Sequence, residues 1–191
     1  MIRKGFWNIE KIVGLTALMV SLLTLIVFVY QTNLLRKQQY MSAYPHLSLM
    51  NEKSGTLQYS FGLSNHGVGP AFIESVKVSA SNDMVYDDII HYVEKTIGKQ
   101  DSINYVYSNL WIGRLIPANE KINLIQLIDD TMIKDWGFVA TENTAKNTLN
   151  TANKLYQILN DNEMDIEIIY SSVYGEKWSI GNHSNVPKKL E

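Results

Sequence analysis

The longest apolar stretch of the chain runs from Ile12 to Tyr30 and contains no charged residue. At about 1.5 Å per residue, a helix over this stretch spans roughly 28 Å, which matches a hydrocarbon core about 30 Å thick. The pattern therefore predicts a transmembrane helix at 12–30 after a flank at 1–11. The alternative is a cleaved signal peptide. However, the run is longer than the roughly 7 to 15 apolar residues of a signal peptide, and no A-x-A-like site follows it. We expect a signal anchor that stays attached.

The charges on either side of this stretch predict its orientation. Arg3, Lys4 and Lys11 precede it, whereas Arg36 and Lys37 follow it. Because short segments rich in Lys and Arg stay in the cytoplasm, the excess before the helix favours a cytoplasmic N-terminus. We therefore expect a single-pass protein of the inner (plasma) membrane, in contact with the lipid bilayer, whose remaining chain is extracytoplasmic.

Small residues recur along one stripe of the predicted membrane helix, at Gly14, Ala17, Ser21 and Thr24. Such a stripe lets two helix backbones approach closely, so it is a candidate packing face for a homo-oligomer or a partner membrane protein. Small residues are also common in membrane helices that have no such role. The sequence leaves both interpretations open.

The polarity changes after Tyr30, where residues 31–45 are polar and favour helix. We expect them to extend the membrane helix as a stalk, which must end before Pro45 because proline disfavours helix at the residue before it. From His46 the pattern alternates with a period of two, most clearly from Leu57 to Ser64, as expected of a half-buried strand. This predicts one β-rich domain at 46–183, followed by a frayed tail at 184–191.

The alternation predicts further elements within this domain. Its slip near Glu74 is typical of a β-bulge, and Asp83 and Gly98 lie where they could cap the two ends of a helix. The strands expected are 46–51, 57–64, 71–79, 104–112, 121–128, 164–174 and 177–180, and the helices expected are 85–97 and 141–160. This order favours a mainly-β domain, an immunoglobulin-like β-sandwich with two inserted helices, and an α+β layer is the alternative.

Two short motifs carry a resemblance. The first is Asn65-x-Gly67-x-Gly69-Pro70-Ala71, and the second is the run from Tyr170 to Trp178, with the sequence YSSVYGEKW. With a proline after the stalk, the chain resembles a group of uncharacterised bacterial single-pass membrane proteins that share an N-x-G-x-G-P-A turn and a C-terminal Y-x-S-V-Y-G-x-x-W motif. The resemblance implies a membrane anchor followed by a β-rich domain, and it implies no activity.

The first motif has a structural explanation in its residue types. Gly67 and Gly69 permit positive φ or a close backbone approach, Pro70 ends strand pairing, and Asn65 can bond nearby backbone in an Asx-type turn. A phosphate-binding loop would instead lead into a helix, whereas a strand is expected after Pro70. We therefore expect a structural turn. The aromatic residues of the second motif favour core packing over a ligand platform.

The charge of the chain argues against nucleic acid as a partner. Its 191 residues carry 17 basic and 19 acidic side chains, a formal net charge of −2. Without the first thirty residues, 14 basic and 18 acidic side chains remain, a net charge of −4. Binding to phosphate backbones requires clustered Lys and Arg, which an acidic domain opposes.

No pattern in the chain predicts catalysis or a cofactor. There is no cysteine, and the four histidines are isolated, without the spacing of a metal-binding pair. The acidic series Asp161 to Glu167 is similar to the start of a calcium loop, but Ile166 stands where the loop needs glycine. Asp165 and Glu167 fit better as the exposed face of a strand. We expect no enzymatic activity, no metal and no cofactor.

The sequence thus favours a membrane-anchored binding or assembly module without catalytic activity. The alternative is a subunit of an oligomeric membrane effector or pore that its soluble domain regulates. Both hypotheses use the helix at 12–30 for location and assembly, and they differ in whether the membrane segment itself has the activity.

Overall fold

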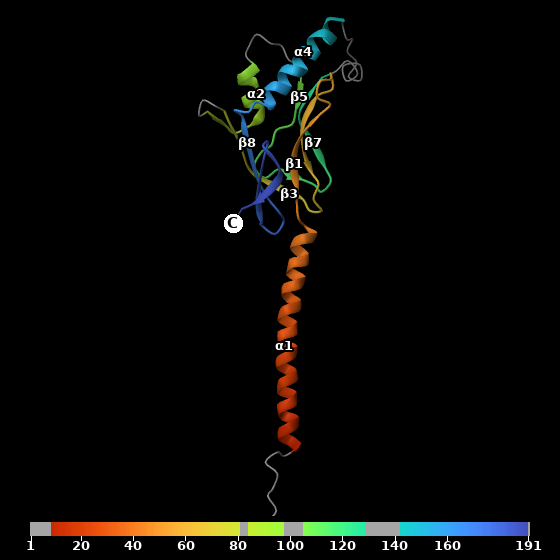
Figure 1. Cartoon of the computed structure of the whole chain (residues 1–191), viewed down its shortest axis with the longest axis vertical. Helices are drawn as coiled ribbons and strands as arrows, with labels where there is room; N and C mark the ends of the chain where they lie inside the picture. The colour runs from red at the N-terminus through yellow and green to blue at the C-terminus, as the bar shows by residue number, and fades with distance from the viewer. Residues whose placement is uncertain (1–8, 81–83, 98–104, 129–141, 191) are drawn as a thin grey trace, which may run out of the picture. The chain divides into compact units, whose positions relative to one another are not determined.

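The computed structural model of the chain describes residues 9–80, 84–97, 105–128 and 142–190. The chain separates into two compact units, Met1–Ser42 and Ala43–Glu191. The first holds a long apolar helix, and the second holds two antiparallel sheets with further helices (Figure 1). A helix followed by a mainly-β domain is the architecture that the sequence predicted.

Helix α1 (Ile9–Ser42) includes both the predicted span and most of the predicted stalk. Its 34 residues correspond to about 51 Å of helix. No residue of α1 is buried. By length and composition α1 can cross a membrane.

The first sheet has four strands, in the order β1-β2-β7-β5. These are β1 (Leu47–Glu52), β2 (Ser60–Asn65), β7 (Lys121–Leu127) and β5 (Tyr105–Tyr107). Phe61 and Leu63 of β2 lie in the core, but Ser60, Gly62 and Ser64 are buried as well, so the strand is not half-buried as the sequence predicted. Strand β2 begins at Ser60 rather than at Leu57, because residues before it form a turn in which the Thr56 amide donates to the Lys53 carbonyl (3.1 Å).

The second sheet has six strands, in the order β10-β9-β8-β3-β4, with β6 also paired to β3. They are β10 (Ser184–Lys189), β9 (Lys177–Gly181), β8 (Asp165–Ser171), β3 (Ala71–Ser79), β4 (Val85–Tyr86) and β6 (Leu115–Ile116). The register between β3 and β8 shifts between Ile73 and Ser75, which confirms the bulge predicted near Glu74. Residues 184–189 correct the predicted tail: they form β10, because Ser184, Lys188 and Lys189 pair with β9.

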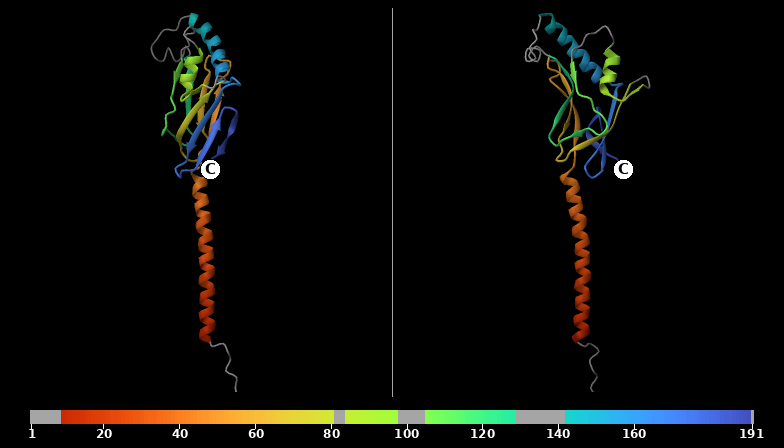
Figure 2. Two further views of the ribbon diagram at one scale, coloured as in Figure 1. Left: turned by 90° about the vertical axis from the view of Figure 1, so that its left-hand side faces the viewer. Right: turned by 180° about the vertical axis from the view of Figure 1, so that it is seen from behind.

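Two helices lie at one end of the sheets, α2 (Ile89–Ile97) and α4 (Glu142–Leu159), at the end where β8 begins (Figures 1 and 2). The prediction that a helix starts at Val85 was wrong. Residues 85 and 86 extend the β3 hairpin as β4, and α2 starts at Ile89, where the Asp88 carboxylate accepts from the Ile90 amide (3.0 Å). The predicted caps Asp83 and Gly98 lie outside the described residues.

One hydrophobic core joins both sheets and both helices. Its fully buried members include Phe61 and Leu63 from the first sheet, Ile166 and Ile168 from the second, and Leu155 from α4. The strand predicted at 104–112 is shorter than expected: β5 ends at Tyr107, and the chain then crosses to β3 on the other sheet. That crossing leaves an exposed turn.

Candidate functional site

The two motifs of the sequence meet around one short segment, Ala43–His46, which directly follows α1 in the chain. We call this arrangement the linker clamp, and it consists of Ala43–His46, the turn Asn65–Pro70, and the aromatic residues Tyr170 and Trp178. All of it lies within the unit Ala43–Glu191.

Asn65 is the centre of the linker clamp, and it is fully buried at the end of β2. Its Oδ1 accepts from the amides of His46 (3.1 Å) and Gly67 (3.0 Å), and the second bond is an Asx-type turn. Its Nδ2 donates to the carbonyl of Gly69 (2.9 Å) and to those of Ile116 (3.2 Å) and Pro117 (3.1 Å). One side chain thereby joins the linker segment, the motif turn and the β6 strand.

The two glycines of the turn allow the backbone of the linker segment to approach closely. Neither has positive φ, and both are buried. A Cβ atom on Gly67 would lie 2.3 Å from the Tyr44 carbonyl oxygen, and one on Gly69 would lie 2.1 Å from the Ala43 carbonyl oxygen. Real side chains do not tolerate such contacts, so the backbone of the linker segment fits here only beside glycine.

Backbone hydrogen bonds complete this side of the clamp. The amides of Val68 (3.0 Å) and Gly69 (3.2 Å) both donate to the Tyr44 carbonyl, and the His66 amide donates to the His46 carbonyl (2.8 Å). Pro70 is the last residue before β3, and it separates the turn from the strand. The segment after α1 is thus held by main-chain bonds as well as by Asn65.

The C-terminal motif supplies the other side of the linker clamp. Tyr170 and Trp178, which are paired on β8 and β9, stack with centroids 5.9 Å apart, and the Tyr44 ring packs edge-on against Trp178 at 5.4 Å. The Tyr170 hydroxyl accepts from the Leu47 amide (3.4 Å), and burial raises the pKa of this phenol. Both motif rings are buried, which confirms the core interpretation for them, whereas Tyr174 lies in the exposed turn between the strands.

The small-residue stripe of α1 is exposed along its length. A Cβ atom added to Gly14 would meet no other atom within 4 Å, and the Ser21 and Thr24 hydroxyls donate to the carbonyls of Ala17 and Val20 (both 2.8 Å). These hydroxyls are therefore satisfied within the helix and can face an apolar environment. All four residues of the stripe are exposed.

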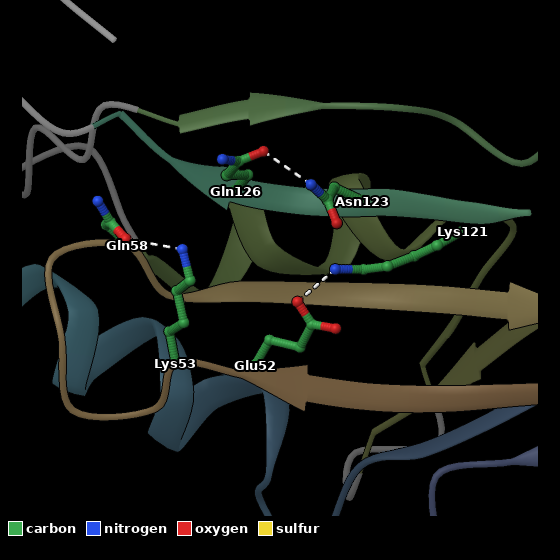
Figure 3. A network of polar contacts seen from close by, with 6 residues as sticks. All are labelled: Glu52, Lys53, Gln58, Lys121, Asn123 and Gln126. Carbon is green, nitrogen blue, oxygen red and sulfur yellow. Dashed lines mark hydrogen bonds and ion pairs between the residues drawn. The ribbon is translucent and has the colours of Figure 1, made fainter. Parts of the chain in front are cut away.

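The outer face of the first sheet carries a polar network (Figure 3). The Lys121 ammonium pairs with the Glu52 carboxylate, and its side chain passes over Gly62, whose missing Cβ would lie 3.3 Å from the lysine Cε. Asn123 Nδ2 donates to Gln126 Oε1 (2.8 Å), while its buried Oδ1 has no hydrogen-bond partner among the described residues. The Lys121–Glu52 pair is about one-third exposed, so it contributes at most about 1 kcal/mol.

The residues considered for metal binding stay apart. Among the described residues, no group of three or more histidine, aspartate or glutamate side chains could hold a metal ion. In the acidic series, the Asp161 carboxylate accepts from the Glu163 amide (3.0 Å). Asp165 and Glu167 are exposed on β8 while Ile166 is fully buried, which confirms the alternation of a strand.

An open groove of about 660 Å³ lies beside α2. Its wall contains Tyr86, whose ring packs edge-on against His91 (5.5 Å) and Tyr92 (5.6 Å). Burial raises the pKa of the Tyr92 phenol. Polar side chains also line the groove, namely His91, Lys95, Thr96 and Asp161.

Sequence reasoning missed a second feature, which we call the apolar turn: Trp111, Ile112 and Leu115, between β5 and the end of β6. Their side chains are 60%, 76% and 47% exposed. The Arg114 amide donates to the Trp111 carbonyl (3.0 Å), and Gly113 has φ of +85°, as a type II turn requires. The sequence W-I-G-R at 111–114 is compatible with a type II turn, but the strand-like composition of 104–112 obscures this signal.

Comparison with known proteins finds no matching family model, no matching curated protein and no matching solved structure.

Proposed function

We propose that this protein is a membrane-anchored binding and assembly module without catalytic activity. Helix α1 anchors it in the inner membrane as a single-pass protein, with its N-terminus in the cytoplasm and the domain outside. The two sheets form an immunoglobulin-like sandwich that presents its edges and turns to a protein partner. Sheet edges and loops are common protein-recognition surfaces and need no special chemistry.

The observation that carries this proposal is the linker clamp. The segment that follows the anchor is held by the buried Asn65 side chain and by main-chain bonds from Val68 and Gly69. Its aromatic residue, Tyr44, packs on Trp178. Residues of both motifs thus bind the segment Ala43–His46, where the chain passes from α1 into the domain. The segment that follows the anchor is therefore part of the folded domain, which supports a domain that begins directly after the anchor.

The proposal is tested by purifying the tagged full chain from membranes in a mild detergent and measuring the mass of the complex by light scattering. An assembly is expected, either of several copies or with a second protein in fixed stoichiometry. The matched control is the Asn153→Ala variant, which changes an exposed residue of α4 and should purify with the same composition.

A strict monomer without a stoichiometric partner contradicts the proposal. Recovery of the chain in the soluble fraction after alkaline carbonate extraction contradicts it independently, because a spanning helix resists that treatment. The two measurements separate the anchoring role of α1 from the binding role of the domain.

A further inference from the structure

We propose that β5 is the docking edge of the domain, where an extended segment of a partner protein continues the first sheet through main-chain hydrogen bonds. The segment has apolar side chains at alternate positions and a basic side chain at the end near Glu94. This inference rests on the proposed function, which it deepens by naming the edge that binds and the chemistry of the segment bound there.

One side of β5 has unpaired main-chain groups. Strand β5 is the last strand of the first sheet, and among the described residues it pairs with β7 alone (Figure 3, where β5, β7, β2 and β1 follow one another from top to bottom). The Ser108 amide donates to the Leu124 carbonyl (3.0 Å) in the same register, so Ser108 and Val106 direct their main-chain groups to β7. The alternation of an antiparallel pair then directs the N–H and C=O groups of Tyr105 and Tyr107 away from β7. These four groups are complementary to another strand.

The other strands at sheet edges are short, charged or covered, as is typical of edges that do not bind a further chain. Strand β10 contains Pro187, Lys188 and Lys189, and β4 and β6 have two residues each. Strand β1 lies against β9 and β10 of the second sheet. By contrast, the β5 ladder continues in register to Ser108, and residues 105–112 contain neither a charged residue nor a proline.

The side chains beside this edge indicate the pattern of the segment that fits it. Tyr107 lies opposite the fully buried Ile125, so the two tyrosines of β5 belong to the inner face of the sheet. Tyr105 packs against the core, whereas the Tyr107 ring is 54% exposed. Val106 lies opposite Gln126, which belongs to the polar network of the outer face. A strand added here meets an aromatic ring on one face and polar side chains on the other, which favours alternation of apolar and polar residues.

Charge favours a different protein over a second copy. Without its first 42 residues, the chain keeps 12 of its 17 basic and 18 of its 19 acidic side chains, a net charge of −6. Burial and the nearby Glu94 carboxylate of α2 both raise the pKa of the Tyr105 phenol, which places a negative charge close to the edge. A second copy would bring a domain of the same charge, and its own residues 105–112 have no basic side chain to approach Glu94. A partner segment with a lysine or arginine has the complementary charge.

The first test requires no partner. In the full chain alone in detergent, hydrogen exchange followed residue by residue should be at least tenfold faster for the Tyr105 and Tyr107 amides than for the Val106 amide, which faces β7. Equal protection of the three amides would show that the edge is already covered, and would overturn the inference.

The second test identifies the occupant in native membranes. Tyr107 of the full chain is replaced by the photoreactive residue benzoylphenylalanine, and the matched control carries the same residue in place of Val186, which is 73% exposed on β10. Illumination should crosslink position 107 to one segment of another protein, with alternating apolar residues and a lysine or arginine, and should yield at least tenfold less of this product from position 186. A crosslinked dimer of this chain, crosslinking to lipid alone, equal products from both positions or no product would overturn the inference.

The third test separates main-chain pairing from side-chain contact. Tyr107→Pro and Tyr107→Thr both lose the ring, but only proline loses the N–H that points away from β7. The partner recovered with the full chain in mild detergent should fall about tenfold for Tyr107→Pro and stay within about twofold for Tyr107→Thr, and equal recovery from the two variants would overturn the inference. Tyr107→Lys, which adds a charge typical of edges that do not pair, should also lose the partner, and this variant decides the result if Tyr107→Pro changes the thermal transition.

The outcomes distinguish this inference from the proposed function. If the Tyr107→Pro and Tyr107→Lys variants keep the partner, the docking edge is refuted and the proposed function survives. If the unaltered chain is a monomer without a partner, both fail.

Discussion

Replacement of Asn65 by alanine is the perturbation for which the structure gives the clearest expected magnitude. The change removes one acceptor shared by the amides of His46 and Gly67, and one donor shared by three carbonyls. A buried amide left without an acceptor costs about 1–3 kcal/mol, so two of them, partly relieved by water, lower the free energy of unfolding by about 3 kcal/mol. For a unit of this size, that loss lowers the melting temperature by about 10 °C.

The assay for Asn65→Ala is thermal unfolding of the full chain in detergent, followed by the β-sheet signal in circular dichroism. Hydrogen exchange of the peptide that contains His46 and Leu47 reports the clamp directly, since the His46 amide loses its acceptor. The control is Asn153→Ala, which changes an exposed residue of α4 and should leave the melting temperature unchanged. If Asn65→Ala melts within about 2 °C of the control and exchange is unchanged, the linker clamp does not stabilise the domain.

The remaining predictions concern the glycines, the buried tyrosine and the helix stripe. Gly69→Ala should destabilise the domain at least as much as Asn65→Ala, because its Cβ would lie 2.1 Å from a carbonyl oxygen, whereas Gly14→Ala, with no atom within 4 Å, should leave the melting temperature unchanged. Because burial raises the pKa of Tyr170 above its ordinary value of 10.0, the unfolded state ionises first and the free energy of unfolding should fall as pH rises above about 10. In denaturant titrations between pH 8 and 11, the free energy of unfolding of Tyr170→Phe should fall less steeply with pH than that of the unaltered protein. An equally steep fall would show that Tyr170 is not the group responsible. If the stripe packs, Ala17→Leu should weaken helix association in a membrane two-hybrid assay, and equal association would argue against it.

Much of the architecture was predictable from local patterns. The apolar run of α1, the alternation in β3 and the bulge near Glu74 each depend on residues close together in the chain, and all three appear in the structure. The predicted tail failed because β10 contains Pro187 and two lysines, which locally look like an unpaired end. Such residues also suit an edge strand, where they discourage further pairing.

The linker clamp could be predicted only in part. The residue types of the first motif indicate a turn, and an asparagine that bonds nearby backbone follows from them. The bonds from Asn65 to Ile116 and Pro117, and the packing of Tyr44 on Trp178, join residues more than fifty positions apart. Because tertiary pairing alone brings these residues together, no local pattern could reveal that both motifs hold one segment.

The apolar turn was missed for a related reason. Residues 104–112 have the composition of a strand, but among the described residues of this range only Tyr105–Tyr107 form the ladder with β7, and one further bond joins the Ser108 amide to the Leu124 carbonyl (3.0 Å). The positive φ of Gly113 then reverses the chain so that Leu115 pairs with Phe72 of β3. Trp111 and Ile112 favour strands by residue type, but here they lie in the turn that connects the two sheets, because β-propensity depends strongly on context.

The most direct test of the account is the side of the membrane on which the domain lies. A single cysteine introduced by Asn153→Cys, at an exposed position of α4, is treated with a membrane-impermeant maleimide in cells whose plasma membrane is sealed. A membrane anchor with a cytoplasmic N-terminus and an external module predicts labelling before lysis. Labelling only after lysis would contradict that orientation and place the domain, with any partner, in the cytoplasm.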